Sequence, residues 1–246
     1  NGRGAVATAS GHAAQFITFF TLMEPGDEFI ASKNLYGGSI TQFGISFKKL
    51  GWNCKFVDPS NPINFTKAIT KNTKAVIAVH LAGNPCELNE LSELCDKNNI
   101  ILIEDFSQAH GAKWKGKKIG SFGKISYGSF QQSKQITCGE GGVIVTNNKK
   151  LYNRAFIGVD KAWQRYRPLE KRFYEFLAPN VRFNSIQAAI LKPQLKRLDN
   201  LIERKRQIAK KFSKCIDNFS DYIKPQRIYP KGNSSYYSFP LFVLYI

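Results

Sequence analysis

The chain has 246 residues, of which 43% are hydrophobic, and its 36 Lys and Arg against 18 Asp and Glu give a formal net charge of +18. This length and composition support one sizeable hydrophobic core and exclude an intrinsically disordered chain. The most apolar stretch, residues 13–23, is too short to span a bilayer. The five cysteines include no C-x-x-C pair, which argues against a disulfide framework or a structural zinc site and indicates a reducing cytoplasm.

The positive charge is distributed over several short basic runs, at 48–49, 113–118, 149–150 and 204–214. No aromatic and basic recognition motif accompanies these runs, so nucleic acid is not the favoured partner. We interpret the charge as solvated faces that also attract an anionic substrate. A surface that binds a polyanion is the alternative.

Helical and strand-like segments alternate along the first 150 residues, after an opening turn. Apolar spacing predicts helices at 11–23, 39–50, 65–70 and 88–98, and strands at 28–31, 53–57, 75–81, 100–104, 125–130 and 143–146. Parallel strands require crossover connections of this kind. The pattern therefore predicts an α/β fold with a mostly parallel sheet flanked by helices.

The second part of the chain has a different pattern. Residues 149–179 are polar and aromatic and predict an irregular surface excursion, whereas a long amphipathic helix is predicted from Ser185 onward. We place the domain boundary there, with a large domain at 1–184 and the start of a small α+β domain within 185–246. The chain opens without methionine and stops inside an apolar run, so we expect it to be a fragment with a truncated small domain.

Two residues at the ends of predicted strands suggest a cofactor. Asp105 follows the apolar strand at 100–104, and Lys134 follows the strand at 125–130 and precedes a glycine-rich turn. Open α/β sheets bind ligands at the carboxyl ends of their strands. Pyridoxal phosphate requires such a pair, a lysine for its aldehyde and an acid for its pyridine nitrogen. An ordinary surface lysine is the alternative.

Four separated motifs, at 80–85 (HLAGNP), 104–111 (EDFSQAHG), 129–142 and 180–189, follow one another in an order and spacing that resemble the DegT/DnrJ/EryC1/StrS sugar aminotransferase family. The resemblance covers residues 80–246. It implies the fold of type I pyridoxal-phosphate-dependent transferases and pyridoxal 5'-phosphate as cofactor. It also implies a homodimer with shared active sites.

The same resemblance assigns roles to individual residues. It implies that Lys134 forms the Schiff base and that Asp105 pairs with the pyridine nitrogen of the cofactor. Gln108 would lie beside the cofactor ring, and Ser129 would bind its phosphate. Asn180 would reach the phosphate in a neighbouring subunit.

The first 78 residues resemble a different family of the same fold type. The stretches 5–15, 23–43 and 51–61 are similar to O-acetylhomoserine sulfhydrylases of the Cys/Met metabolism family. This predicts a chimeric chain with a seam near residues 75–80.

Further cofactor contacts are expected in this N-terminal part. The backbone N–H groups of Gly11 and His12, at a helix N-terminus, are expected to bind the phosphate, because such groups lack partners and the helix dipole favours an anion. An ordinary helix cap is the alternative. By resemblance to the sulfhydrylases, Tyr36 would stack on the pyridine ring, with turn packing as the alternative.

These residues predict a transaminase. Related sugar dehydratases carry a histidine in place of the lysine, so Lys134 favours transfer of an amino group from glutamine or glutamate to a keto-sugar or keto-cyclitol. The sequence of residues 131–134 (QQSK) resembles that of enzymes that aminate scyllo-inosose with glutamine. One alternative is a sulfhydrylase-like γ-replacement enzyme, and another is a catalytically inert fold-type-I fragment that serves in binding or assembly.

No metal centre is expected. The three histidines are too scattered in sequence to form a recognisable metal motif. Cys138 lies near Lys134, but no residue adjacent in sequence would activate its thiol, so we do not expect it to act as a nucleophile.

Overall fold

The computed structural model describes residues 4–244, and its centre is a seven-stranded sheet with the strand order β1-β9-β8-β5-β4-β2-β3. The pairs from β3 through to β8 are parallel, while β9 pairs antiparallel with both β8 and β1. The strands are β1 (Gly4–Thr8), β2 (Glu28–Ser32), β3 (Asn53–Val57), β4 (Thr73–Val79), β5 (Ile101–Asp105), β8 (Ile125–Ser129) and β9 (Gly142–Thr146). The predicted α/β class with a mostly parallel sheet is confirmed.

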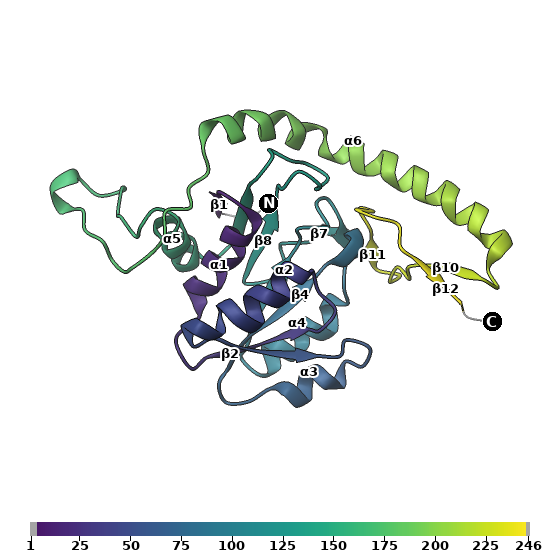
Figure 1. The fold of residues 1–246 in the computed structure, drawn as a ribbon, viewed down its shortest axis with the longest axis horizontal. Coiled ribbons are helices and arrows are strands. Elements are labelled where there is room, and N and C mark those ends of the chain that lie inside the picture. The colour runs from purple at the N-terminus through teal and green to yellow at the C-terminus, as the bar shows by residue number, and fades with distance from the viewer. Residues whose placement is uncertain (1–3, 245–246) are drawn as a thin grey trace.

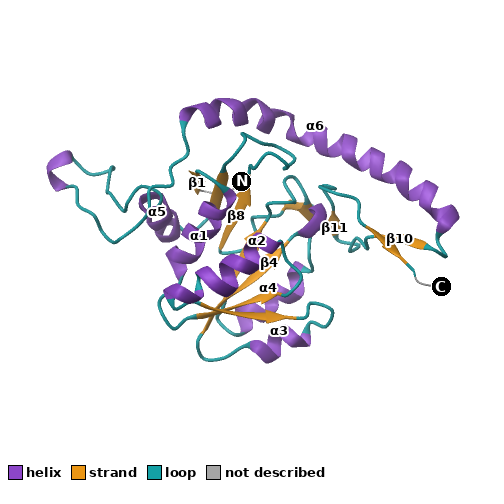
Figure 2. Ribbon diagram, viewed as in Figure 1, coloured by secondary structure: helices purple, strands orange, loops and turns teal. Residues whose placement is uncertain are grey.

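Helices cover both faces of this sheet, as Figures 1 and 2 show. Alternate residues of β4 explain why: Ala75 and Ile77 belong to a core shared with α1 and α5, whereas Val76 and Ala78 belong to a core shared with α4. A strand buried on both faces is continuously apolar, as parallel strands usually are. The helices are α1 (Gly11–Leu22), α2 (Gly37–Thr41), α3 (Ile63–Ala68), α4 (Leu88–Lys97), α5 (Lys149–Gly158) and α6 (Ser185–Ile216).

The predicted helix at 39–50 is interrupted. After α2 the chain forms a π-helical segment, Gln42–Ser46, and then a 3-10 turn, Lys48–Leu50. The wider turn keeps Phe43 and Phe47 fully buried in the aromatic core beneath α1. Apolar spacing predicted the burial of this segment but not its change of helix type.

Two predictions were wrong, one for the opening turn and one for the start of the expected excursion. The opening turn contains strand β1, which closes the sheet against β9. The first ten residues of the expected excursion form α5, whose N-terminus is capped by the Asn148 side chain through the N–H groups of Lys150 and Leu151. The rest of the excursion, residues 159–179, is irregular apart from the 3-10 turn Leu169–Lys171 and isolated β-bridges.

Helix α6 begins at the residue predicted for the domain boundary. Asn184 and Gln187 form a capping box, in which the side-chain oxygen of each residue accepts the backbone N–H of the other. Figure 1 shows α6 running along the sheet domain toward the short ribbon of β10 (Ile223–Pro225) and β12 (Leu241–Val243). The division into two domains at this point remains a prediction.

The segment that follows α6 returns to the sheet domain. Strand β11 (Gly232–Asn233) pairs with β6 (Lys113–Trp114), which pairs with β7 (Lys117–Lys118). Ser234 and Ser235 are buried, and both donate to the carbonyl oxygen of Gly83 at 2.9 Å. We call residues 232–238 the return segment. Its hydrogen bonds bring the C-terminal part of the chain to the ends of β4 and β5.

Residues 4–244 contain no helix that combines the length and the apolar character required to cross a membrane. Within the same residues, no three His, Cys, Asp or Glu side chains gather in a way that could hold a metal ion. All five cysteines are free thiols. A cytoplasmic location remains a prediction.

Candidate active site

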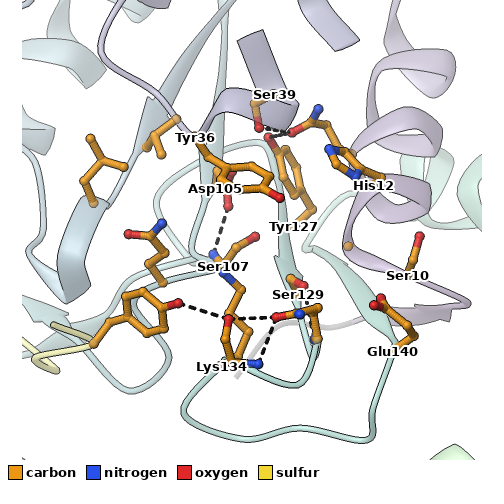
Figure 3. A pocket seen from close by; sticks show the side chains of 18 residues that line it. Ser10, His12, Tyr36, Ser39, Asp105, Ser107, Tyr127, Ser129, Lys134 and Glu140 are labelled. Atoms are coloured by element: carbon orange, nitrogen blue, oxygen red, sulfur yellow. Dashed lines mark hydrogen bonds between the residues drawn. The ribbon is translucent and has the colours of Figure 1, made fainter. Parts of the chain in front are cut away.

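A cavity of about 330 Å³ lies at the carboxyl ends of β5 and β8, beside the N-terminus of α1. Figure 3 shows the side chains of Tyr36, Asp105, Ser129 and Lys134 around this space. Seven of the eight predicted site residues line it: Gly11, His12, Tyr36, Asp105, Gln108, Ser129 and Lys134. Residues far apart in sequence therefore meet in one place, as the strand-end argument predicted.

Lys134 is held by the turn that follows β8. Its N–H donates to the carbonyl oxygen of Gln131 at 2.9 Å, and its side chain is half-buried. The ammonium nitrogen lies 5.0 Å from the centroid of the Tyr237 ring and 5.9 Å from that of Tyr36. The rings of Tyr237 and Tyr36 thus border the amine and leave less room for water beside it.

Asp105 is the last residue of β5, and only 7% of its surface is exposed. Its carboxylate accepts the Ser107 N–H at 2.8 Å. Burial raises the pKa of Asp105 above its ordinary value, although hydrogen bonds from Ser107 and Tyr127 oppose this. A carboxylate in such surroundings is stabilised by a cation placed in the cavity.

An anion-binding end lies opposite, where α1 begins. The Ser10 side chain caps α1 by accepting the Ala13 N–H at 3.1 Å, and the first N–H groups of the helix, from Gly11 onward, have no partner within it. A Cβ atom added at Gly11 would lie 2.5 Å from the Ser129 side chain. The backbone of α1 therefore approaches Ser129 more closely than any residue other than glycine allows.

Gln108 and Tyr36 complete the predicted set. The side-chain oxygen of Gln108 accepts the Ala82 N–H at 2.8 Å. The backbone carbonyl oxygen of Gln108 accepts from the Gln135 side chain, also at 2.8 Å. Tyr36 is 57% exposed, and its ring centroid lies 6.1 Å from that of His12. Gln108 is thus fixed by both neighbours, whereas Tyr36 covers the open side of the cavity.

Asn180 does not line the cavity. It is exposed in the loop before α6, where its side chain accepts from Arg182 Nε at 3.1 Å and its backbone bridges to Asp160. Within one chain it therefore does not meet Lys134 or Ser129, and its predicted role toward a neighbouring subunit remains untested.

Sequence reasoning missed several residues of the cavity wall. The most important is Tyr237 of the return segment, whose hydroxyl lies 3.1 Å from the Ser133 hydroxyl. Gln15 was missed as well, although its side chain accepts from both Ser39, at 3.0 Å, and Tyr127, at 2.8 Å. The pattern of residues 233–239 (NSSYYSF) gives no local signal of this contact, because it depends on hydrogen bonds to Gly83.

The residues fit pyridoxal phosphate. The cavity offers an amine at Lys134 for an aldehyde, a buried carboxylate at Asp105 for a protonated ring nitrogen, and a helix N-terminus with Ser129 for a phosphate. A phosphate binds at helix N-termini because the unpaired N–H groups and the helix dipole both attract it. The close approach at Gly11 is the backbone cradle that such a group requires.

Replacing Gly11 with alanine is expected to lower the affinity for pyridoxal phosphate by at least about 10-fold, or 1.4 kcal/mol. The new Cβ would lie 2.5 Å from Ser129, so that α1 and Ser129 must separate. Titration of the visible band of the bound cofactor measures this affinity. Gly37→Ala is the matched control, because an added Cβ there meets no atom within 4 Å. Equal affinities of the two variants would contradict the assignment of the phosphate end.

Comparison with known families gives one match over nearly the whole chain. The model of the DegT/DnrJ/EryC1/StrS aminotransferase family matches residues 2–244. The match includes residues 2–78, the part that resembles the sulfhydrylases, and crosses the position of the predicted seam. A single family pattern thus describes both parts of the chain.

Individual relatives and solved structures agree with this match. GDP-perosamine synthase of Escherichia coli O157:H7 is 36% identical over 223 residues, which are 87% of this chain and 59% of that protein. DesV of S. venezuelae has a TM-score of 0.88 at 28% identity, covering 97% of this chain and 64% of DesV. E coli GDP-4-keto-6-deoxy-D-mannose-3-dehydratase with bound hydrated PLP has a TM-score of 0.87 at 27% identity, covering 99% and 68%. The chain spans between 43% and 59% of the length of the curated relatives.

Proposed function

Because the chain belongs to the DegT/DnrJ/EryC1/StrS aminotransferase family, we propose that it transfers an amino group from glutamine or glutamate to a keto-sugar or keto-cyclitol. The observation that carries this proposal is the meeting of Lys134, Asp105 and the N-terminus of α1 in one cavity. The name of GDP-perosamine synthase supports a sugar as acceptor. The sequence of residues 131–134 supports a keto-cyclitol as the second candidate acceptor.

Bound pyridoxal phosphate supplies an aldehyde that accepts the donor's nitrogen and a conjugated ring that withdraws electrons from the adjoining carbon. Asp105 would hold the positive charge of the ring nitrogen in place, because this buried carboxylate forms no ion pair with a Lys, Arg or His side chain among residues 4–244. Ser129 and the first N–H groups of α1 bind the phosphate, and Tyr36 covers the ring. Each contact fixes a different edge of the cofactor.

Lys134 has two roles in this proposal. Its amine would hold the cofactor covalently, and the same amine would move a proton at the reacting carbon atoms. The rings of Tyr36 and Tyr237 border the amine on two sides and limit its contact with water.

A second copy of the chain is the proposed partner. Asn180 is exposed and lies outside the cavity of its own chain, which supports a role for its side chain in the site of a neighbouring subunit. The excursion that precedes it also exposes large apolar side chains, at Tyr166, Leu169, Tyr174 and Leu177. Burial of these side chains would contribute to a homodimer with shared active sites.

The test begins with pyridoxal phosphate and the purified chain. We expect a visible band of the bound cofactor that fades when glutamine or glutamate is added and returns when the acceptor is added. A nucleotide-linked 4-keto-6-deoxy sugar and scyllo-inosose, compared as acceptors, separate the two substrate classes. The amino product is identified by mass.

Other outcomes point to the alternative functions. Release of acetate from O-acetylhomoserine with sulfide, without amino transfer, would support the sulfhydrylase-like reaction. Salt-sensitive binding of nucleic acid without uptake of the cofactor would support an inert polyanion-binding fold. Either result would overturn the proposed transfer.

A further inference from the structure

A second group of reactive side chains lies outside the catalytic cavity. The sulfur of Cys86 is 3.5 Å from His80 Nδ1, and His80 Nε2 is 3.1 Å from a carboxylate oxygen of Glu104. Both His80 and Glu104 have no exposed surface, whereas Cys86 is half-buried. A nucleophile, a base and a group that orients the base thus form a chain, the arrangement that activates serine and cysteine nucleophiles.

Glu104 is stabilised as a carboxylate. Burial raises its pKa, but the hydrogen bond from His80 and those from the backbone N–H groups of Gly123 and Gly120 hold the pKa of Glu104 below its ordinary value. Those two N–H groups donate at 2.6 and 2.7 Å, and Phe122 donates a third at 2.7 Å. The charged carboxylate therefore directs the His80 Nε2 proton toward itself and leaves Nδ1 facing the thiol.

His80 has the properties of a base toward Cys86. Burial alone would lower the pKa of His80, but Cys86 and Glu104, one at each ring nitrogen, raise it to about 10. The Cys86 N–H also donates to Nδ1, at 3.2 Å, so Nδ1 is an acceptor in this arrangement, and the bond holds the turn that carries the thiol against the ring. A proton moved from the sulfur to Nδ1 produces an imidazolium between two anions.

The position of Cys86 relative to α4 adds to this effect. Cys86 directly precedes Glu87, the N-cap residue of α4, whose side chain accepts the Asn89 N–H at 3.0 Å. The positive end of a helix dipole stabilises a nearby thiolate. Three carboxylates oppose this stabilisation of a thiolate: Glu87 at the N-cap, and Glu90 and Glu93 on α4. Lys97 is the cation of α4 that lines the same groove as these three residues.

A groove of about 760 Å³ gives access to the thiol. It lies between α3 and α4, and its apolar lining includes Ile63, Phe65, Leu91 and Leu94, with Cys86 at one edge. Only Val79 and Leu81 also line the catalytic cavity, and no residue assigned to the cofactor lines the groove. An apolar lining with three glutamates favours small uncharged molecules over anions.

We propose that Cys86, His80 and Glu104 form a second reactive site, in which the Cys86 thiol is covalently modified by small uncharged carbon electrophiles that enter this groove. The thiol gives its proton to His80 Nδ1, and a lone pair of the sulfur forms the bond to carbon. The leaving group departs with the electron pair of its former bond to that carbon. His80 keeps the proton as an imidazolium beside the Glu104 carboxylate.

Iodoacetamide is the probe, with iodide as its leaving group, and Cys215 is the internal control because it is exposed on α6. At pH 6 an ordinary thiol with a pKa of about 8.5 is less than about 1% ionised. We expect Cys86 to be alkylated at least about 10-fold faster than Cys215 at this pH, as followed by peptide mass. A rate at Cys86 equal to or below that at Cys215 would overturn the proposal.

The charge of the probe gives a second test on the same protein. Iodoacetate should react more slowly than iodoacetamide at Cys86, because Glu87, Glu90 and Glu93 line the groove. Cys215 has Lys214 and Lys211 beside it in α6 and should show a smaller preference or the reverse. The same preference at both cysteines would mean that the groove does not govern the reaction.

The variant His80→Gln keeps a hydrogen-bonding side chain but removes the base. We expect it to slow alkylation of Cys86 at pH 6 by at least about 10-fold while the rate at Cys215 is unchanged. Cys86→Ser should lose the modification with no change in the circular dichroism spectrum. An unchanged rate at Cys86 in His80→Gln would contradict the proposal, and if that variant does not fold, the comparison of Cys86 with Cys215 in the unmodified sequence decides.

Discussion

Replacing Lys134 with alanine is expected to reduce amino transfer by at least about 10⁴-fold, because one side chain supplies both the covalent attachment and the proton transfer. The cavity contains no second lysine among its lining residues. Its remaining contacts, at Ser129, Asp105 and the N-terminus of α1, bind the cofactor without a bond. The variant should therefore retain pyridoxal phosphate in the cavity but lose the visible band of the covalently attached form.

Two measurements separate this result from unfolding. Equilibrium dialysis reports whether cofactor is still bound, and initial rates with glutamine report transfer. Lys150→Ala serves as a matched control, since Lys150 is exposed on α5 and remote from the cavity lining. Transfer by Lys134→Ala at more than about 1% of the original rate would show that another group carries the proton.

The parts of the site that the sequence predicted correctly depend on local patterns. Asp105 ends a continuously apolar strand, and Gly11 begins an apolar helix after a capping serine. Strand ends and helix starts are defined by neighbouring residues, and in an α/β sheet both kinds of end meet at one edge. Their meeting therefore followed from the predicted fold before any contact was known.

Other parts depend on contacts between distant residues. Tyr237 reaches Lys134 only because Ser234 and Ser235 bind the carbonyl oxygen of Gly83, some 150 residues earlier. The pairing of His80 with Glu104 likewise joins adjacent strands, β4 and β5, at a register fixed by the sheet. No pattern within a short window encodes such contacts, so neither the place of Tyr237 in the cavity wall nor the contact of Cys86 with His80 was predicted.

The two predictions about chain segments that were wrong have a similar origin. Residues 149–158 form α5 because Asn148 caps the first turn and Ala155 and Ile157 are buried in the core, and the polar composition of the wider segment 149–179 concealed this helix. Strand β1 is short, and only two of its residues, Val6 and Thr8, are buried. Its partner β9 lies more than 130 residues later in the chain. Tertiary packing decided both cases.

Replacing Asp105 with asparagine is expected to have opposite effects on activity and on the stability of the cofactor-free chain. Asparagine keeps an acceptor for the Ser107 N–H, which Asp105 now accepts at 2.8 Å, but carries no charge. Amino transfer should fall by about 10²–10³-fold, the usual loss when one electrostatic contact to the reacting group is removed. Initial rates at saturating cofactor measure this loss.

Without cofactor, the same variant should be more stable. Burial raises the pKa of Asp105 in the folded chain, so its ionisation at neutral pH opposes folding; this cost decreases as pH falls through the raised folded pKa and is absent once pH reaches the unfolded value near 3.8. A gain of 1 kcal/mol in a chain of this size corresponds to about 2–4 °C in Tm. We therefore expect Asp105→Asn to raise the cofactor-free Tm at pH 7 and to lose this advantage toward pH 4.

Addition of pyridoxal phosphate should reverse the order of the two proteins. A ligand stabilises the folded state in proportion to its affinity, and the original chain gains the contact between carboxylate and ring nitrogen that the variant lacks. Melting curves with and without cofactor thus test Asp105 independently of catalysis. If the variant gained as much stability from pyridoxal phosphate as the original chain, Asp105 would not be the partner of the cofactor's ring nitrogen, even if transfer were slow.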